Sequence, residues 1–139
     1  MNFEDMLQTS PYSLDKEEKG RFLTERLGEL TEKHRESCPQ YRNMLESAGY
    51  DSQKLCSYKE LPFLPVRLFK ELELRSVPKE EVVKTMTSSG TTGQAVSKIY
   101  LDRVTSANQQ KVMVKIVSDF TGSSRMPMII LDCPSVVKN

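Results

Sequence analysis

A short stretch rich in glycine and hydroxyl side chains constrains the fold of this chain more than any other part of the sequence. It runs over residues 87–94 and reads Thr-Ser-Ser-Gly-Thr-Thr-Gly-Gln. Gly90 and Gly93 can adopt positive φ and let the backbone approach a ligand closely. Successive N–H groups in such a loop can form an anion-binding concavity, and the hydroxyls add donors. Composition alone leaves two interpretations open, an ordinary hairpin turn and a phosphate-binding loop.

The loop does not match the common nucleotide-binding motifs. A Walker A motif has four residues between its glycines and then Lys, whereas two residues separate Gly90 from Gly93 here. The dinucleotide fingerprint would need glycine at Ser88. A Gly-x-x-Gly clamp of the KH type is formally present. However, 20 Lys and Arg against 19 Asp and Glu give a net charge of only +1, so we expect no nucleic-acid partner.

The segments on either side of the loop predict two strands. Residues 81–86 are rich in β-formers, and residues 97–102 alternate between polar and apolar side chains. A hairpin is the simplest pairing. Asp102 can cap a helix over residues 103–120, and the continuous apolar run over residues 126–132 is typical of a strand buried on both faces.

The first half of the chain predicts helices. Apolar residues recur at helical spacing over residues 14–37, with Asp15 as N-cap, and Pro39 can begin a second helix that stops at Gly49. The apolar segment 61–70 is expected to dock against the main body. The predicted fold is therefore α/β, with a helical lead-in followed by strand–loop–strand–helix–strand.

This pattern predicts one domain that is incomplete. Residues 1–78 would form a mostly helical region packing on the main body, and residues 79–139 the start of an α/β nucleotide-binding region. A strand buried on both faces needs neighbours on both edges, and the chain offers few other strands.

Other chemistry has little support in the sequence. The three cysteines lack metal-ligand spacing, and His34, the sole histidine, sits at helical spacing from Leu27 and Leu30. We predict no metal site, and the catalytic residues remain unknown. No apolar run reaches the ~20 residues that span a bilayer, and the N-terminus lacks signal-peptide features, which favours a cytoplasmic location.

The residues of the loop resemble the Ser/Thr/Gly-rich phosphate loop of adenylate-forming enzymes. Within that superfamily the chain is most similar to acyl-protein synthetases of the LuxE type, from the fatty-acid reductase complex of bacterial luminescence, and then to phenylacetate–CoA ligases. Further segments carry the resemblance in the family's order: residues 34 and 38–42, 61–70, 97–102, 127–132 and 134–135.

The resemblance implies ATP-dependent activation of a carboxylic acid, a fatty acid in this family, followed by acyl transfer to a thiol. It implies that the loop holds the β- and γ-phosphates of ATP with Mg²⁺. The residues that carry over are Ser88, Ser89, Gly90, Thr91, Thr92 and Gly93. An acyl-acceptor or reductase protein is the implied partner. Family enzymes run to several hundred residues, so the 139 residues alone are expected to be inactive.

A non-catalytic function stays open beside this one. The chain could be an anion-binding or oligomerising module, with the 61–69 segment and exposed strand edges as a homo-oligomer interface. An open reading frame that continues past Asn139 would favour the synthetase, and a stop codon after Asn139 with a stable folded product would favour the module.

Overall fold

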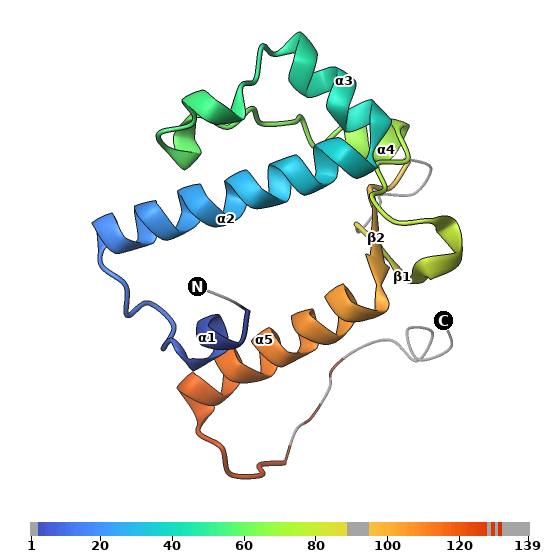
Figure 1. The fold of residues 1–139 in the computed structure, drawn as a ribbon. Coiled ribbons are helices and arrows are strands. Elements are labelled where there is room, and N and C mark those ends of the chain that lie inside the picture. The colour runs from blue at the N-terminus through green and yellow to red at the C-terminus, as the bar shows by residue number, and fades with distance from the viewer. Residues whose placement is uncertain (1–2, 89–94, 128, 130, 132–139) are drawn as a thin grey trace.

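The computed structural model describes residues 3–88, 95–127, 129 and 131, and contains helices and one two-stranded sheet (Figure 1). The described elements are α1 (Phe3–Gln8), α2 (Lys16–Ser37), α3 (Pro39–Ser47), η1 (Ser52–Lys54), η2 (Tyr58–Glu60), α4 (Leu68–Glu71), η3 (Lys79–Glu81), β1 (Val82–Thr87), β2 (Lys98–Asp102) and α5 (Arg103–Thr121). The prediction of helices followed by strand, loop, strand and helix is confirmed to this point. The combination of helices with a small two-stranded sheet is consistent with an α/β protein.

The capping residues predicted from the sequence fix the starts of the long helices. The Asp15 carboxylate accepts the backbone N–H groups of Glu17 and Glu18, and the Glu18 side chain accepts the N–H of Asp15. This reciprocal pair satisfies donors that the first turn of α2 leaves free. Asp102 caps α5 in the same manner, accepting the N–H of Thr105 at 2.6 Å.

A small core joins α2 to α3 and to the segment that follows. Leu45 and Cys38 are 1% and 2% exposed, and the Thr24 hydroxyl accepts the N–H of Tyr58 at 2.9 Å. Gly28 leaves room for Leu55, whose Cδ2 would lie 3.1 Å from a Cβ added to that glycine. Together these contacts hold the chain between η1 and η2 against the middle of α2.

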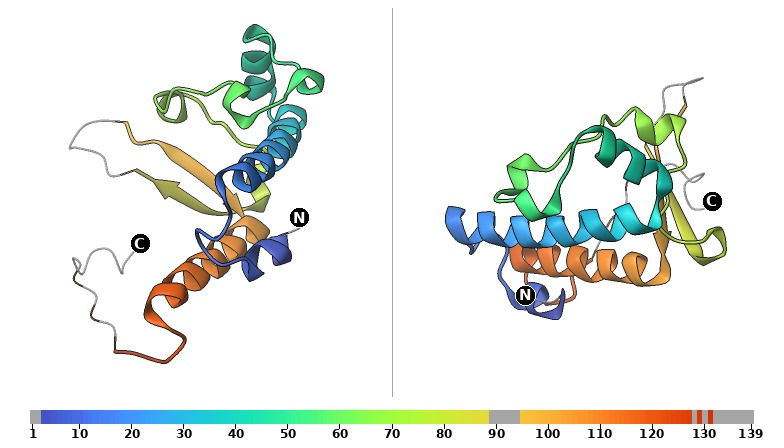
Figure 2. Two further views of the ribbon diagram at one scale, coloured as in Figure 1. Left: turned by 90° about the vertical axis from the view of Figure 1, so that its left-hand side faces the viewer. Right: turned by 45° about the horizontal axis from the view of Figure 1, so that its top comes forward.

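The two strands form an antiparallel hairpin, as predicted. Thr87 pairs with Lys98 and Met86 with Ile99, and the register shifts between Val82 and Lys84. The hairpin stands at the start of α5, while α1 lies against the other end of that helix (Figure 1). Figure 2 shows α2 and α5 on the same side of the hairpin. Thr87 and Lys98, the last described pair of the hairpin before the 87–94 loop, therefore lie at its end remote from α5.

The predicted strand over residues 126–132 is wrong for the residues that the structure describes. Met126, Pro127, Ile129 and Leu131 are in no strand, and Ile129 and Leu131 are 84% and 93% exposed. A strand buried on both faces needs a hydrogen-bonded neighbour on each edge. Within the described residues, β1 and β2 pair with each other, and neither pairs with this run.

Part of segment 61–70 packs against the rest of the protein, as expected for the whole segment. Leu61, Leu64, Leu68 and Phe69 are partly covered, and Pro65 precedes the short helix α4 as predicted. Phe63 and Val66 instead point to solvent, at 90% and 69% exposure. Each proline disfavours a helical conformation for the residue before it, and Val66 lies in the exposed turn that precedes α4.

Candidate functional site

The hydrogen bonds of Ser88 and Ser97 close the base of the loop. The backbone N–H of Ser88 donates to the carbonyl of Ser97 at 3.1 Å, and the backbone N–H of Ser97 donates to the hydroxyl oxygen of Ser88 at 3.0 Å. Ser97 is 8% exposed, so this junction is anchored in the body of the hairpin. The pair extends the β-ladder by one step beyond Thr87 and Lys98.

Ser88 is the one predicted phosphate ligand that lies among the described residues. Its side chain is exposed, and its hydroxyl accepts a hydrogen bond from Ser97, which leaves the hydroxyl hydrogen free to donate elsewhere. The other predicted ligands, Ser89, Gly90, Thr91, Thr92 and Gly93, lie outside the described residues. Their role as phosphate ligands stays a prediction.

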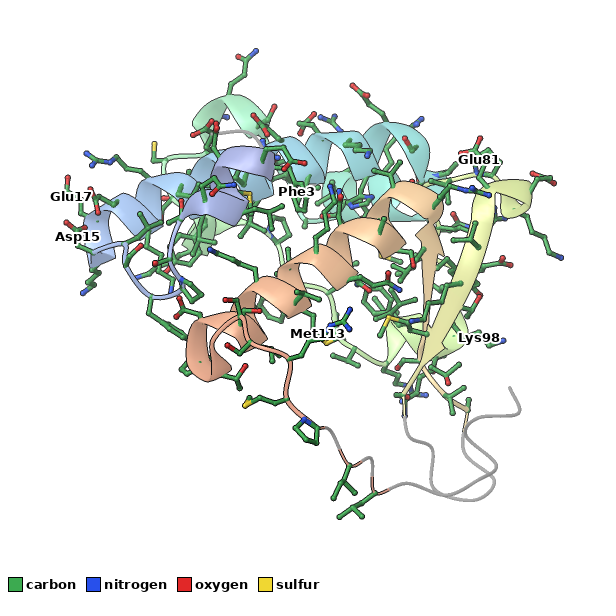
Figure 3. The ribbon with its side chains drawn as sticks, turned by 90° about the horizontal axis from the view of Figure 1, so that it is seen from below. Phe3, Asp15, Glu17, Glu81, Lys98 and Met113 are labelled. Atoms are coloured by element: carbon green, nitrogen blue, oxygen red, sulfur yellow. The ribbon has the colours of Figure 1, made fainter. Side chains whose placement is uncertain are left out.

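A lysine at the base of the loop was not assigned from the sequence. Lys98 begins β2 opposite Thr87, is exposed, and lies at the loop end of the hairpin (Figure 3). Among the described residues no ion pair is recorded for its ammonium group. Strand alternation alone did not establish which face Lys98 would occupy, whereas the register with Thr87 places its Cα at the base of the loop.

At the other end of the hairpin, Asp102 joins β2 to α5, because it is the last residue of the strand and the N-cap of the helix. The pKa of the Asp102 carboxyl lies below its ordinary value, because the backbone N–H and the side chain of Thr105 donate hydrogen bonds to it. Asp102 thus stays ionised at the N-terminus of α5, where a negative charge is stabilising.

His34 lies near the end of α2 and contacts residues from two other parts of the chain. Its Nδ1 lies 2.6 Å from the hydroxyl of Ser76, and its ring packs edge-on against Tyr41. Partial burial lowers the pKa of His34 from its usual value, with a smaller effect of Lys33. The contact between His34 and Ser76 joins the end of α2 to the segment before η3, and neither residue belongs to the 87–94 loop.

The part of the chain that the structure describes shows no metal site and two free cysteines. No group of three His, Cys, Asp or Glu side chains there could hold a metal ion. Cys38 is buried and Cys56 is exposed, both as free thiols, while Cys133 lies outside the described residues. None of the helices described is both long and apolar enough to cross a membrane.

Comparison with known proteins decides the family. The family model of the acyl-protein synthetase LuxE matches residues 2–139. The chain belongs to the LuxE acyl-protein synthetase family. This membership confirms the resemblance drawn from the loop and the ordered segments around it, and it supports an acyl-activating ligase family.

A curated relative with a different name is also similar to the chain. Over 121 residues the chain is 31% identical to a phenylacetate–coenzyme A ligase from Thermus thermophilus, an alignment that covers 81% of this chain and 26% of the relative. The chain therefore spans about a quarter of the length of that ligase. No solved structure is significantly similar to the chain. The assignment of the chain to the adenylate-forming fold therefore stays a prediction.

Proposed function

We propose that this chain contributes the ATP-phosphate loop of a carboxylate-activating acyl-protein synthetase. The observation that carries the proposal is the hairpin. Ser88, within the 87–94 stretch that matches the family's phosphate loop in sequence, is hydrogen-bonded to Ser97 on the opposite side of the hairpin. Membership of the LuxE family supports the reaction class.

In the proposed reaction a carboxylate oxygen attacks the α-phosphorus of ATP, and pyrophosphate leaves. The acyl-adenylate then loses AMP when a thiol sulfur attacks its carbonyl carbon. The work of the loop is to position and neutralise the β- and γ-phosphates, because charge stabilisation and alignment dominate such transfers. A carboxylic acid, fatty acids included, is the proposed substrate, and the acceptor thiol or reductase protein is the proposed partner.

The residues that flank the loop fit this task. The Ser88 hydroxyl keeps one hydrogen to donate, and Lys98, which has no ion pair with the described residues, places a positive charge at the loop base. Mg²⁺, when bound with ATP, would neutralise phosphate charge. Since the described residues contain no carboxylate cluster, the phosphates, water and loop hydroxyls would supply its ligands. The proposed compartment is the cytoplasm.

We propose further that these 139 residues do not complete the reaction alone, since they align to about a quarter of the phenylacetate–CoA ligase. A carboxylate-dependent ATP–pyrophosphate exchange assay on the chain tests this, with no exchange expected.

Titration of Mg-ATP into the chain tests the loop assignment by calorimetry. Gly90→Val and Thr91→Val should weaken binding at least ~10-fold, since each removes a close approach or a donor at the phosphates. Thr85→Val, at an exposed position of β1 outside the 87–94 loop, is the matched control and should bind as the wild type does. Equal affinity in all four proteins would refute the assignment.

A second candidate function rests on uncovered apolar surface. Met113, Val117 and Phe120 of α5 are 62%, 46% and 69% exposed, and Val83 of β1 is 53% exposed. Each strand of the hairpin also has one edge without a described partner. A homo-oligomer formed through these surfaces is the alternative, and sedimentation equilibrium showing a monomer at all concentrations would exclude it.

A further inference from the structure

An apolar groove of ≈ 440 Å³ lies at the end of α5 that is remote from the hairpin. It runs between α1, the connection to α2, the first turns of α2 and the second half of α5 (Figure 1). Apolar side chains from all of these elements form its walls: Met6, Leu7, Leu14, Phe22, Leu23 and Ile116. This size and lining are typical of small-molecule sites.

Two lysines give the groove a positive charge. Lys19 of α2 and Lys115 of α5 both line it, and no acidic side chain is among the described residues around it. Neither ammonium group has a recorded ion pair within the described part of the chain. Lys111, one turn before Lys115, is instead paired with Glu4 at 3.3 Å. The groove therefore combines apolar walls with two lysines that form no ion pair with the described residues.

Hydroxyl groups add a polar patch at the same groove. Thr9, Ser10 and Ser13 line it, and the first and last of these donate to the main-chain carbonyls of Asp5 and Ser10. The hydroxyl of Ser10 has no recorded hydrogen bond among the described residues. A donor is thus available beside the lysines for an acidic head group.

Tyr12 forms part of the rim at some cost in backbone energy. Its φ is 64°, in the left-handed region that costs a residue with a Cβ about 1 kcal/mol. Its ring packs edge-on against Phe120, with centroids 6.3 Å apart, and joins the α1–α2 connection to the end of α5. The rim is therefore held by a contact across the two walls.

We propose that this groove binds a single-chain amphiphile with a phosphate monoester head. The alkyl chain would lie along the apolar walls, since the groove is about three times the ~150 Å³ cavity that accommodates benzene. The phosphate would meet Lys19 and Lys115, because a monoester carries about −1.5 to −2 at neutral pH and suits two positive charges better than a carboxylate does. This site is separate from the 87–94 loop and does not depend on the function proposed for it.

Calorimetric titration of the 139-residue chain with dodecyl phosphate, below its micellar concentration, tests the proposal. Dodecyl phosphate should bind, dodecanoate should bind several-fold more weakly, and inorganic phosphate and dodecyltrimethylammonium should not bind measurably. Dodecanoate binding as tightly as dodecyl phosphate would refute the phosphate head group. Binding of the cationic amphiphile with equal affinity would refute a charged site altogether.

Matched variants locate the site. The double variant Lys19→Gln/Lys115→Gln should weaken dodecyl phosphate binding about tenfold, the combined effect of two exposed ion pairs. Lys16→Gln/Lys59→Gln, which removes two exposed lysines outside the groove, should leave it unchanged. Ile116→Ser should weaken binding and Val114→Ser, on the same helix but away from the groove, should not. Equal dissociation constants within either pair would overturn the proposal.

Discussion

Replacing Ser88 with alanine should loosen the base of the loop. The change removes the Ser88 hydroxyl oxygen, which accepts the backbone N–H of Ser97 at 3.0 Å. Ser97 is only 8% exposed, so its N–H would lose its partner in a buried position. A buried donor left without a partner costs about 1–2 kcal/mol. For a chain of this length that corresponds to a fall in melting temperature of about 4–8 °C, which thermal unfolding followed by far-UV circular dichroism can measure.

Ser88→Thr is the control for this prediction. It keeps the acceptor oxygen, and because Ser88 is exposed the added methyl group has room. Its melting temperature should stay within about 2 °C of the wild type, a difference typical of a surface change. Two results would refute this reasoning: a melting temperature of Ser88→Ala equal to that of the wild type, or a melting temperature of Ser88→Thr as low as that of Ser88→Ala. Either would show that the hydrogen bond does not hold the loop base.

Three further predictions concern stability, each measured by urea unfolding. Leu45→Ala should cost about 2–4 kcal/mol because this side chain is 1% exposed, whereas Glu46→Ala, its exposed neighbour, should change little. Gly49→Ala should destabilise by about 1 kcal/mol because φ is +68°; Gly20→Ala, equally open around its Cβ but inside α2, should stabilise. Asp102→Ala should cost about 1 kcal/mol at pH 7. Because its folded-state pKa is depressed, this gap should shrink as the pH falls below the unfolded value of about 3.9 and the wild-type carboxylate protonates. A gap independent of pH would contradict the cap.

Local rules were sufficient to predict most of the elements. Asp15 and Asp102 mark helix starts because a carboxylate satisfies free N–H groups within a few residues, and both cap as expected. The alternation over residues 97–102 predicts a strand because neighbouring side chains on one face share an environment. The hairpin follows from two such strands joined by a short loop.

Features that depend on distant parts of the chain could not be predicted this way. The apolar run around Ile129 reads as a buried strand, yet burial is decided by neighbours that a local pattern does not specify. The left-handed Tyr12 and the groove beside it arise from the meeting of α1 with α5, more than 100 residues apart in the chain.

The candidate site likewise has some features that the local sequence predicts and others that depend on the fold. The glycines and hydroxyls of residues 87–94 leave both a hairpin turn and an anion-binding loop open, and the resemblance to the family's phosphate loop favours the second. The second function of Ser88, as the acceptor for Ser97, depends on the strand register. The position of Lys98 opposite Thr87 depends on it too. Composition cannot supply a register, because it depends on how the two strands pair.

The central claim is that the 87–94 loop grips the β- and γ-phosphates, and a ranking of phosphate ligands tests it most directly. Calorimetry in the presence of Mg²⁺ should give affinities in the order ATP and tripolyphosphate, then ADP, then AMP. The difference between ATP and AMP should be about tenfold or more and should vanish in Gly90→Val. If AMP binds as tightly as ATP, or if Gly90→Val keeps the wild-type ranking, this loop does not hold the phosphate chain.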